Sequence, residues 1–317
     1  MKKFFVKDLK AGMEFSEIFV LRKKELKEYD GQKFLKLELG DKTGRIDGVL
    51  WEEAQRFYTK AEIGEVIRVK GTTLTYREAL QIKIDTLQKT GPEEVDPKDF
   101  LPSTEKDLDL LFEKFKNTKD SIENPFLRKL LDLFGDDFDL MRRFKVAPGG
   151  KLWHHSYLGG LLEHTLNVVD LCTQAAKLYE LVDKDLLIAG ALLHDIGKIS
   201  QYQVSSFIDY SDEGRLVGHV VSGYELVSRK IEQIKDFPEE LSLHLKHLIL
   251  SHQGELELAS PVVPQTMEAI ILHYADEMDA KAGAFAHIIK KQKTLGKKWS
   301  DWIPLIKRYI YFGEERE

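Results

Sequence analysis

The sequence predicts a protein of two domains, a small β-barrel over residues 1–90 followed by an all-helical domain over residues 104–317. Three observations support this fold class. Apolar residues alternate with polar ones in the first part, apolar residues recur at helical spacing in the second, and residues 91–103 contain three prolines that suit neither a sheet nor a helix core. A chain of 317 residues is long enough for two separate cores. We therefore expect residues 91–103 to be a linker.

The first domain has the pattern of a barrel built from short strands. Residues 33–39 alternate strictly and place Leu35, Leu37 and Leu39 on one face. We expect five strands with one helix after the third: strands over residues 14–22, 33–39, 45–51, 65–71 and 80–87, and the helix over residues 52–61. This number and order are typical of an OB-fold, a five-stranded Greek-key barrel that often binds single-stranded nucleic acid.

Aromatic and basic residues share the face opposite the leucines. The candidate nucleic-acid-binding residues are Phe34, Lys36, Arg45 and Trp51. A single strand stacks its bases on aromatic rings and places its phosphates beside Lys and Arg. Residues 1–90 carry 19 Lys and Arg against 15 Asp and Glu (net +4), and the remainder carry 28 against 38 (net −10). Polar residues on a barrel surface are more commonly only solvated, and Trp51 suits a core equally well, so both interpretations stay open.

The composition also indicates the cellular compartment. The single cysteine, Cys172, excludes an internal disulfide and favours a reducing environment. No secretory signal follows the first residues, and no apolar run is long enough to cross a bilayer. We expect a cytoplasmic protein that does not enter a membrane, and self-association into a homo-oligomer is left open.

The second domain is organised around a His-Asp pair at the end of an apolar helix. Residues 186–193 are all apolar or small, His194 and Asp195 follow, and Gly197 ends the helix. Burying a carboxylate beside an imidazole is costly unless a partner compensates both. A divalent metal does so, since it binds a neutral imidazole and an ionised carboxylate together. A simple His-Asp hydrogen bond at a helix end is the alternative.

Four other segments supply further candidate ligands, and in three of them a polar residue follows or interrupts an apolar helical run. These candidates are His164, His219, His252 and Asp276. Several imidazoles and carboxylates on core-facing positions require a shared partner, because a buried polar group without one is disfavoured. Such ligands suit Mn, Fe, Co, Ni or Zn, and the absence of thiolates argues against a structural zinc site.

The segments GGLLEHT, LLHDIGK and HYADEMDAK resemble the H…HD…D pattern of the HD-domain metal-dependent phosphohydrolases. The resemblance implies an HD domain, with one metal ion held by His164, His194, Asp195 and Asp276. Asp195 would also bridge to a second ion, held with His219 and His252. The resemblance thus implies two divalent ions as cofactor, for which we expect Mn²⁺, with Fe, Co or Ni as alternatives.

The whole chain resembles the YhaM family of bacterial 3′→5′ exoribonucleases, through FLKLELGDKTGRIDGVLW in the barrel and WHHSYLGGLLEHT in the helical domain. One departure is Gln253, where members often carry a second histidine. The resemblance implies hydrolysis of single-stranded RNA, or DNA, from the 3′ end, with Asp195 central to catalysis. Lys198 would contact phosphate, and His154 and His155 would bind phosphate or protonate the leaving oxygen.

Three other functions stay open at this point. The helical domain could hydrolyse a small or cyclic nucleotide, with the barrel serving only oligomerisation. The protein could be a non-catalytic single-strand binder, although the intact ligand set argues against this. A di-iron site of this kind can also support oxygen chemistry, which the attached barrel disfavours. Turnover of short RNA against a panel of nucleotides would separate the first of these from an exonuclease.

Overall fold

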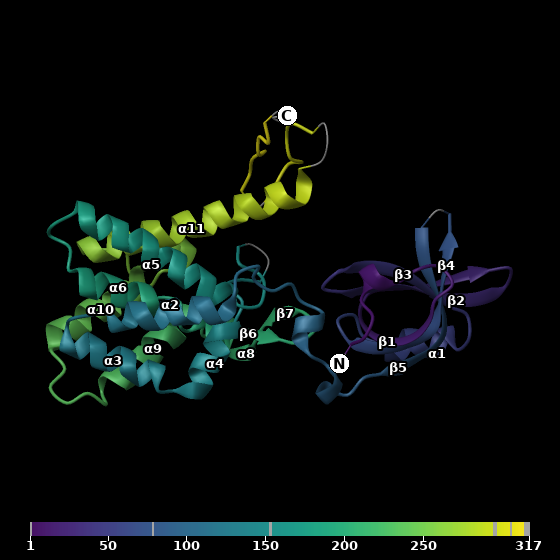
Figure 1. Cartoon of the computed structure of the whole chain (residues 1–317), viewed down its shortest axis with the longest axis horizontal. Helices are drawn as coiled ribbons and strands as arrows, with labels where there is room; N and C mark the ends of the chain where they lie inside the picture. The colour runs from purple at the N-terminus through teal and green to yellow at the C-terminus, as the bar shows by residue number, and fades with distance from the viewer. Residues whose placement is uncertain (1, 78, 152–153, 294–296, 305, 314–317) are drawn as a thin grey trace. The chain divides into compact units, whose positions relative to one another are not determined.

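The computed structural model describes residues 2–77, 79–151, 154–293, 297–304 and 306–313 (Figure 1). The chain divides into two compact units. The first comprises Met1–Ser103 and the short segment Val204–Ile208, and the second comprises Thr104–Gln203 and Asp209–Glu317.

The first unit is a closed five-stranded barrel with the strand order β1-β2-β3-β5-β4. Its elements are η1 (Val6–Asp8), β1 (Glu14–Tyr29), β2 (Gln32–Asp41), β3 (Gly44–Leu50), α1 (Ala54–Lys60), β4 (Val66–Tyr76) and β5 (Ala79–Lys89), followed by η2 (Pro92–Glu94) and η3 (Pro97–Asp99). β3 pairs with β5 in parallel, and the other pairs are antiparallel. The helix after the third strand and the closure of the barrel confirm the predicted OB-type fold.

The leucine alternation of β2 determines the inside of the barrel. Leu35, Leu37 and Leu39 are each at most 1% exposed and lie in one apolar core with residues from every strand. β1 is longer than predicted, because the polar residues after Arg22 continue to pair with β2. A register shift between Leu21 and Lys23 lets this long strand bend around the closed barrel.

The second unit is a helical domain packed around α6. Its helices are α2 (Leu108–Asp120), α3 (Pro125–Gly135), α4 (Phe138–Val146), α5 (Gly160–Leu178), α6 (Lys184–Leu193), α7 (Lys198–Gln201), α8 (Asp212–Leu216), α9 (His219–Ile231), α10 (Glu239–Ser251), η4 (Leu256–Leu258) and α11 (Met267–Gln292). Every residue of α6 from Leu186 to Leu193 is buried, which explains the uninterrupted apolar run. α5, α10 and α11 contact α6 and cover it.

The prediction of helix throughout residues 104–317 is wrong in two places. Strands β6 (Tyr202–Val204) and β7 (Ile208–Tyr210) form a small hairpin between α7 and α8. After α11, isolated bridges join Trp299 to Tyr311 and Ile303 to Arg308. Both segments mix aromatic and polar residues without a helical period, so periodicity could not identify them.

Two further features concern the single cysteine and the possibility of a membrane-spanning helix. Cys172 on α5 is buried, and burial raises the pKa of its thiol to about 12. Within the described residues, no helix combines the length and the apolar character needed to cross a membrane.

Candidate active site

The ends of helices bring the predicted ligands together. His164 lies in α5, His194 and Asp195 directly follow α6, and His252 directly follows α10. His219 is the first residue of α9, and Asp276 lies in α11. Apart from His219, which is partly exposed, all of these residues are buried. Helices from distant parts of the sequence therefore converge on one polar cluster inside an apolar domain.

Asp195 is the centre of this cluster, and its two carboxylate oxygens face different ligands. Asp195 Oδ2 lies 3.4 Å from His164 Nε2 and 3.4 Å from His194 Nε2. Asp195 Oδ1 lies 3.4 Å from His219 Nε2 and 3.6 Å from His252 Nε2. Asp276 joins the first group, with Oδ1 3.1 Å from His164 Nε2. The donors thus form two sets that share one carboxylate.

The donors fit divalent cations. Among the described residues, neither oxygen of Asp195 has a hydrogen-bond partner, and the Nε2 atoms of His219 and His252 have none either, although all four atoms are buried. Lys198 Nζ forms an ion pair with Asp195 Oδ2 at 2.6 Å. Buried polar atoms without hydrogen-bond partners are costly, and cations placed between Asp195 and the two histidine pairs would satisfy these groups. Imidazole and carboxylate donors are typical ligands of first-row divalent metals.

Hydrogen bonds behind the histidines aim their Nε2 atoms at the centre. His194 Nδ1 donates to the carbonyl oxygen of Ala191 at 2.8 Å, and His252 Nδ1 donates to that of Ile249 at 2.7 Å. Each bond fixes the tautomer that leaves a lone pair on Nε2. The rings are therefore oriented for ligation by contacts within their own helices.

The protonation states of the cluster are set by burial and by neighbouring charged side chains. Burial lowers the pKa of His219 to about 3, and the nearby Lys198 acts in the same direction. Burial alone would raise the pKa of Asp195, but Lys198 and the neighbouring histidines hold it well below its ordinary value. Likewise, hydrogen bonds and charge from His164 lower the pKa of Asp276 in spite of burial. Ionised carboxylates beside a neutral His219 are the protonation states that metal binding requires.

Asp279 is a site residue that sequence reasoning missed. It lies one helical turn after Asp276 on α11, and its Oδ2 accepts hydrogen bonds from His164 Nδ1 at 2.6 Å and from His155 Nε2 at 2.8 Å. Its Oδ1 accepts a bond from Asn167 Nδ2 at 2.8 Å. These bonds lower the pKa of the Asp279 carboxyl against the effect of burial. The i, i+3 spacing from Asp276 was the available signal.

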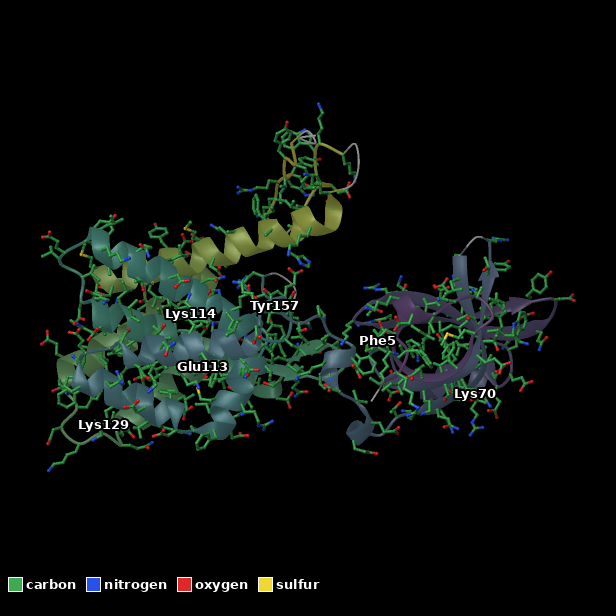
Figure 2. The ribbon with its side chains drawn as sticks, viewed as in Figure 1. Phe5, Lys70, Glu113, Lys114, Lys129 and Tyr157 are labelled. Atoms are coloured by element: carbon green, nitrogen blue, oxygen red, sulfur yellow. The ribbon has the colours of Figure 1, made fainter. Side chains whose placement is uncertain are left out.

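The two neighbouring histidines His154 and His155 have different surroundings. His155 is buried, with Nε2 bound to Asp279 and Nδ1 2.8 Å from the hydroxyl of Tyr157, which lies in the loop before α5 (Figure 2). His154 lines the pocket beside the metal-ligand cluster, and neither of its buried ring nitrogens has a partner. Burial lowers the pKa of His154 to about 3, so its ring is neutral at pH 7.

That pocket has a volume of about 520 Å³ and opens beside the ligand cluster. Its lining includes the ligands His219, His252 and Asp276, together with Lys198 and Gln253. A pocket of this size is in the range of small-molecule sites.

Glycines allow the backbone contacts that build the centre. A Cβ atom on Gly197 would lie 2.1 Å from the carbonyl oxygen of His219, and one on Gly160 would lie 2.1 Å from that of His155. Only glycine lets α9 approach the turn after Asp195 closely enough to bring His219 beside it. α6 already ends at Leu193, so Gly197 of the HDIGK segment is a packing residue and not the predicted helix breaker.

The barrel carries a separate groove of about 630 Å³. Phe34 and Trp51 lie in it with ring centroids 4.7 Å apart, and Lys36 lines it. Sequence reasoning missed the other aromatic and basic lining residues, which are Lys27, Tyr29, Tyr76, Arg77 and Lys83. Arg45 is not among the lining residues and instead pairs with Glu38 at 2.8 Å. Since the missed residues come from other strands, only strand pairing brings them to the groove.

Known protein families match both the helical domain and the barrel. Residues 161–281 match the HD domain family, and residues 19–90 match the OB-fold nucleic acid binding domain family. The six candidate ligands all lie within the first of these matches. The metal-ligand donors and the HD match together indicate dependence on a divalent metal.

Similar proteins share nearly the whole chain. The chain is 31% identical to the 3′-5′ exoribonuclease YhaM of Listeria innocua over 293 residues, which cover 90% of this chain and 91% of that protein. It is 32% identical to that of Bacillus velezensis, covering 80% of each, and 30% identical to that of Bacillus subtilis, covering 83% of each. With its barrel, its HD centre and this extent of similarity, the chain belongs to the YhaM family.

Proposed function

We propose that this protein is a metal-dependent 3′→5′ exoribonuclease that degrades single-stranded RNA at a centre of two divalent ions. The observation that carries the proposal is Asp195, a buried carboxylate whose two oxygens face two separate histidine pairs and have no hydrogen-bond partner. One ion would be held by His164, His194, Asp195 and Asp276. The other would be held by Asp195, His219 and His252. Manganese is the proposed metal, since imidazole and carboxylate ligands both suit it.

When bound, the ions supply a nucleophile derived from water at neutral pH and stabilise charge on the phosphate. The residues of the chain then position the substrate. Lys198 is 7% exposed and lines the pocket, so its ammonium can bind a phosphate oxygen there. His154, neutral and unpartnered in the same pocket, can donate one hydrogen bond to a phosphate or leaving oxygen. His155 is assigned a positioning role, because both of its ring nitrogens face protein groups.

The barrel groove is proposed to bind the strand upstream of the site. Phe34 and Trp51 offer stacking surfaces, while Lys36 and Arg77 offer charges for phosphates. Replacing Trp51 by Ala should weaken binding of a long single strand by about 1–3 kcal/mol, the usual contribution of one stacked base. Tyr58→Ala, which removes an exposed ring of α1 outside the groove, is the matched control, since Tyr58 and Trp51 are each 37% exposed.

A labelled strand tests the direction of hydrolysis. With Mn²⁺, a 5′-labelled single-stranded RNA should give a ladder of shortening labelled products, and the same strand with a 3′ hairpin should give few. Immediate release of labelled mononucleotide would mean attack from the 5′ end, and internal fragments from a circular RNA would mean an endonuclease. Equal turnover of the DNA version would widen the substrate class, and turnover of cyclic or free nucleotides alone would favour a small-molecule hydrolase. Metal analysis of the purified protein tests the number and identity of the ions.

A further inference from the structure

The residues after α11 form a small ordered hairpin that no part of the proposed function uses. We define the C-terminal hairpin as residues 297–304 and 306–313. Ser300 N donates to the carbonyl oxygen of Ile310 at 2.8 Å, and Ile303 N donates to that of Arg308 at 3.1 Å. The side chains of Ser300, Ile303 and Ile310 are buried. The hairpin therefore has its own inner face, and Figure 1 shows this segment beyond the end of α11.

Four large aromatic side chains of the hairpin remain about half exposed. They form two ring pairs, Trp299 with Tyr311 at a centroid distance of 4.8 Å and Trp302 with Tyr309 at 5.2 Å. Their exposed fractions are 54% and 55% in the first pair and 49% and 55% in the second. Cross-strand aromatic pairing stabilises a hairpin, but it does not require half of each ring to face water. Clustered exposed rings are typical of a binding surface.

Positive charge gathers in the same segment. The hairpin contains four Lys and Arg and one Asp, although residues 91–317 as a whole carry a net charge of −10. Lys307 and Arg308 lie exposed at the turn, and in the described part of the chain neither forms an ion pair. A surface that combines aromatic rings with cations on an otherwise acidic domain is complementary to a flexible polyanion with stacking bases.

We propose that the C-terminal hairpin is a second binding surface for single-stranded RNA, which holds the strand upstream of a 3′ end lying in the metal centre. The proposal rests on the proposed exoribonuclease function. α11 joins the two places, because it carries Asp276 and ends at Gln292. Sixteen residues of helix span about 24 Å, a distance that a stacked strand covers with about seven nucleotides at about 3.4 Å each. The benefit should therefore increase with strand length.

The aromatic part of the proposal is tested by binding without turnover. Fluorescence anisotropy with a labelled 20-nucleotide uridine strand in EDTA compares the full-length protein with the double variant Trp302→Ala/Tyr309→Ala. The Kd should rise at least about fivefold, because each stacked base contributes substantially to such binding. Phe138→Ala is the control, since Phe138 is an 85% exposed aromatic outside the hairpin. Circular dichroism confirms that each variant is folded.

The basic part is tested by salt dependence. In the double variant Lys307→Gln/Arg308→Gln, the slope of log K against log salt should become shallower by about 1.4, since each phosphate contact to a single strand contributes about 0.7. Lys129→Gln/Lys235→Gln is the matched control, because both lysines are exposed, and Lys129 lies at the far end of the helical unit from the hairpin (Figure 2). An unchanged slope in the hairpin variant would overturn the proposal.

Substrate length separates this proposal from the proposed function. The aromatic double variant should lower kcat/KM for the 20-nucleotide strand at least about fivefold relative to a trinucleotide. Normal discrimination by length, with normal RNA affinity, would overturn the hairpin's role while leaving the exonuclease intact. If the wild-type protein binds the strand through the hairpin but hydrolyses no RNA, the proposed function alone fails. A change in oligomeric state by light scattering with unchanged RNA affinity would make the hairpin a contact between copies and would overturn the proposal.

Discussion

Asp279 holds His164 from the side opposite the metal-ligand cluster. Its Oδ2 accepts the hydrogen bond from His164 Nδ1 at 2.6 Å, while His164 Nε2 faces Asp195 Oδ2 at 3.4 Å and Asp276 Oδ1 at 3.1 Å. A carboxylate in this position fixes the tautomer and the ring plane of a ligating histidine and raises its basicity.

Replacing Asp279 by Asn should weaken metal binding about 10- to 100-fold, the usual effect of losing such a supporting carboxylate. Titration of the metal-free protein with Mn²⁺ measures the affinity directly. Asp170→Asn on α5 is the control, because Asp170 is an exposed acid that pairs only with Lys114 among the residues described. Unchanged Mn²⁺ affinity in Asp279→Asn would show that His164 needs no such support.

Asp195→Asn should abolish the stabilisation of the protein by metal. At an Mn²⁺ concentration of 100 times Kd, the wild-type protein should gain about 2.7 kcal/mol in unfolding free energy. The variant should gain almost nothing, because it loses the carboxylate that both candidate ligand sets share. Thermal unfolding with and without Mn²⁺ measures the difference. A full Mn²⁺-dependent shift in folded Asp195→Asn would contradict the bridging role.

Gly197→Ala should disturb the centre through the backbone. The new Cβ would lie 2.1 Å from the carbonyl oxygen of His219, so α9 must move away from the turn after Asp195. We expect the free energy of unfolding to fall by about 1–3 kcal/mol, as at other overpacked sites. We also expect Mn²⁺ to bind more weakly.

Gly135→Ala is the matched control for Gly197→Ala. Its Cβ would meet only the end of the Lys119 side chain, at 3.8 Å, so it should change the unfolding free energy by less than about 1 kcal/mol. Chemical denaturation of both variants gives the comparison. If the two substitutions changed the unfolding free energy equally, close packing at Gly197 would not be the cause of the destabilisation.

The imidazole of His219, whose side chain is 17% exposed, should make the metal-free protein sensitive to acid. Burial lowers its pKa in the folded state to about 3 from 6.5, so between these values the unfolded chain binds the additional proton. The stability contribution of His219 is therefore complete above pH 6.5 and is lost as the pH falls towards 3. The limiting slope is about 1.4 kcal/mol per pH unit for one proton.

The measurement is urea unfolding in EDTA at pH 5, 6, 7 and 8. His219→Gln should reduce the pH slope between pH 5 and 6.5 relative to the wild type. Some slope should remain, because the pKa of His154 is lowered in the same way. Identical pH slopes in the two proteins would mean that protonation of His219 does not cause the pH dependence of the unfolding free energy.

The sequence contained enough to predict the architecture where burial imposes a period. The alternation of Leu35, Leu37 and Leu39 and the unbroken run from Leu186 to Leu193 both reflect side chains facing a core, and both predictions are confirmed. The grouping of the six candidate ligands was accessible because polar residues at the ends of apolar runs need partners. Their division into two sets around Asp195 was implied only by the family resemblance, since it depends on how separate helices meet.

Other parts could not be predicted from pattern alone. The spacing from Asp276 puts Asp279 on the same side of a helix, but only the packing of α11 against α5 places it beside His164. The tyrosines of the barrel groove lie on β1 and β4, and only strand pairing brings them beside the two predicted aromatic residues. The C-terminal hairpin has no apolar period, because its few buried residues alternate with exposed aromatic ones.

The buried Cys172 has a practical consequence for studying this molecule. Its thiol is inaccessible, and burial raises its pKa to about 12, so almost no thiolate is present at neutral pH. Reagents such as maleimides should therefore bypass it in the folded protein. A single cysteine introduced at Lys307 could then carry a fluorophore or spin label alone, and the movement of an RNA strand across this turn could be followed during degradation without first removing a natural residue.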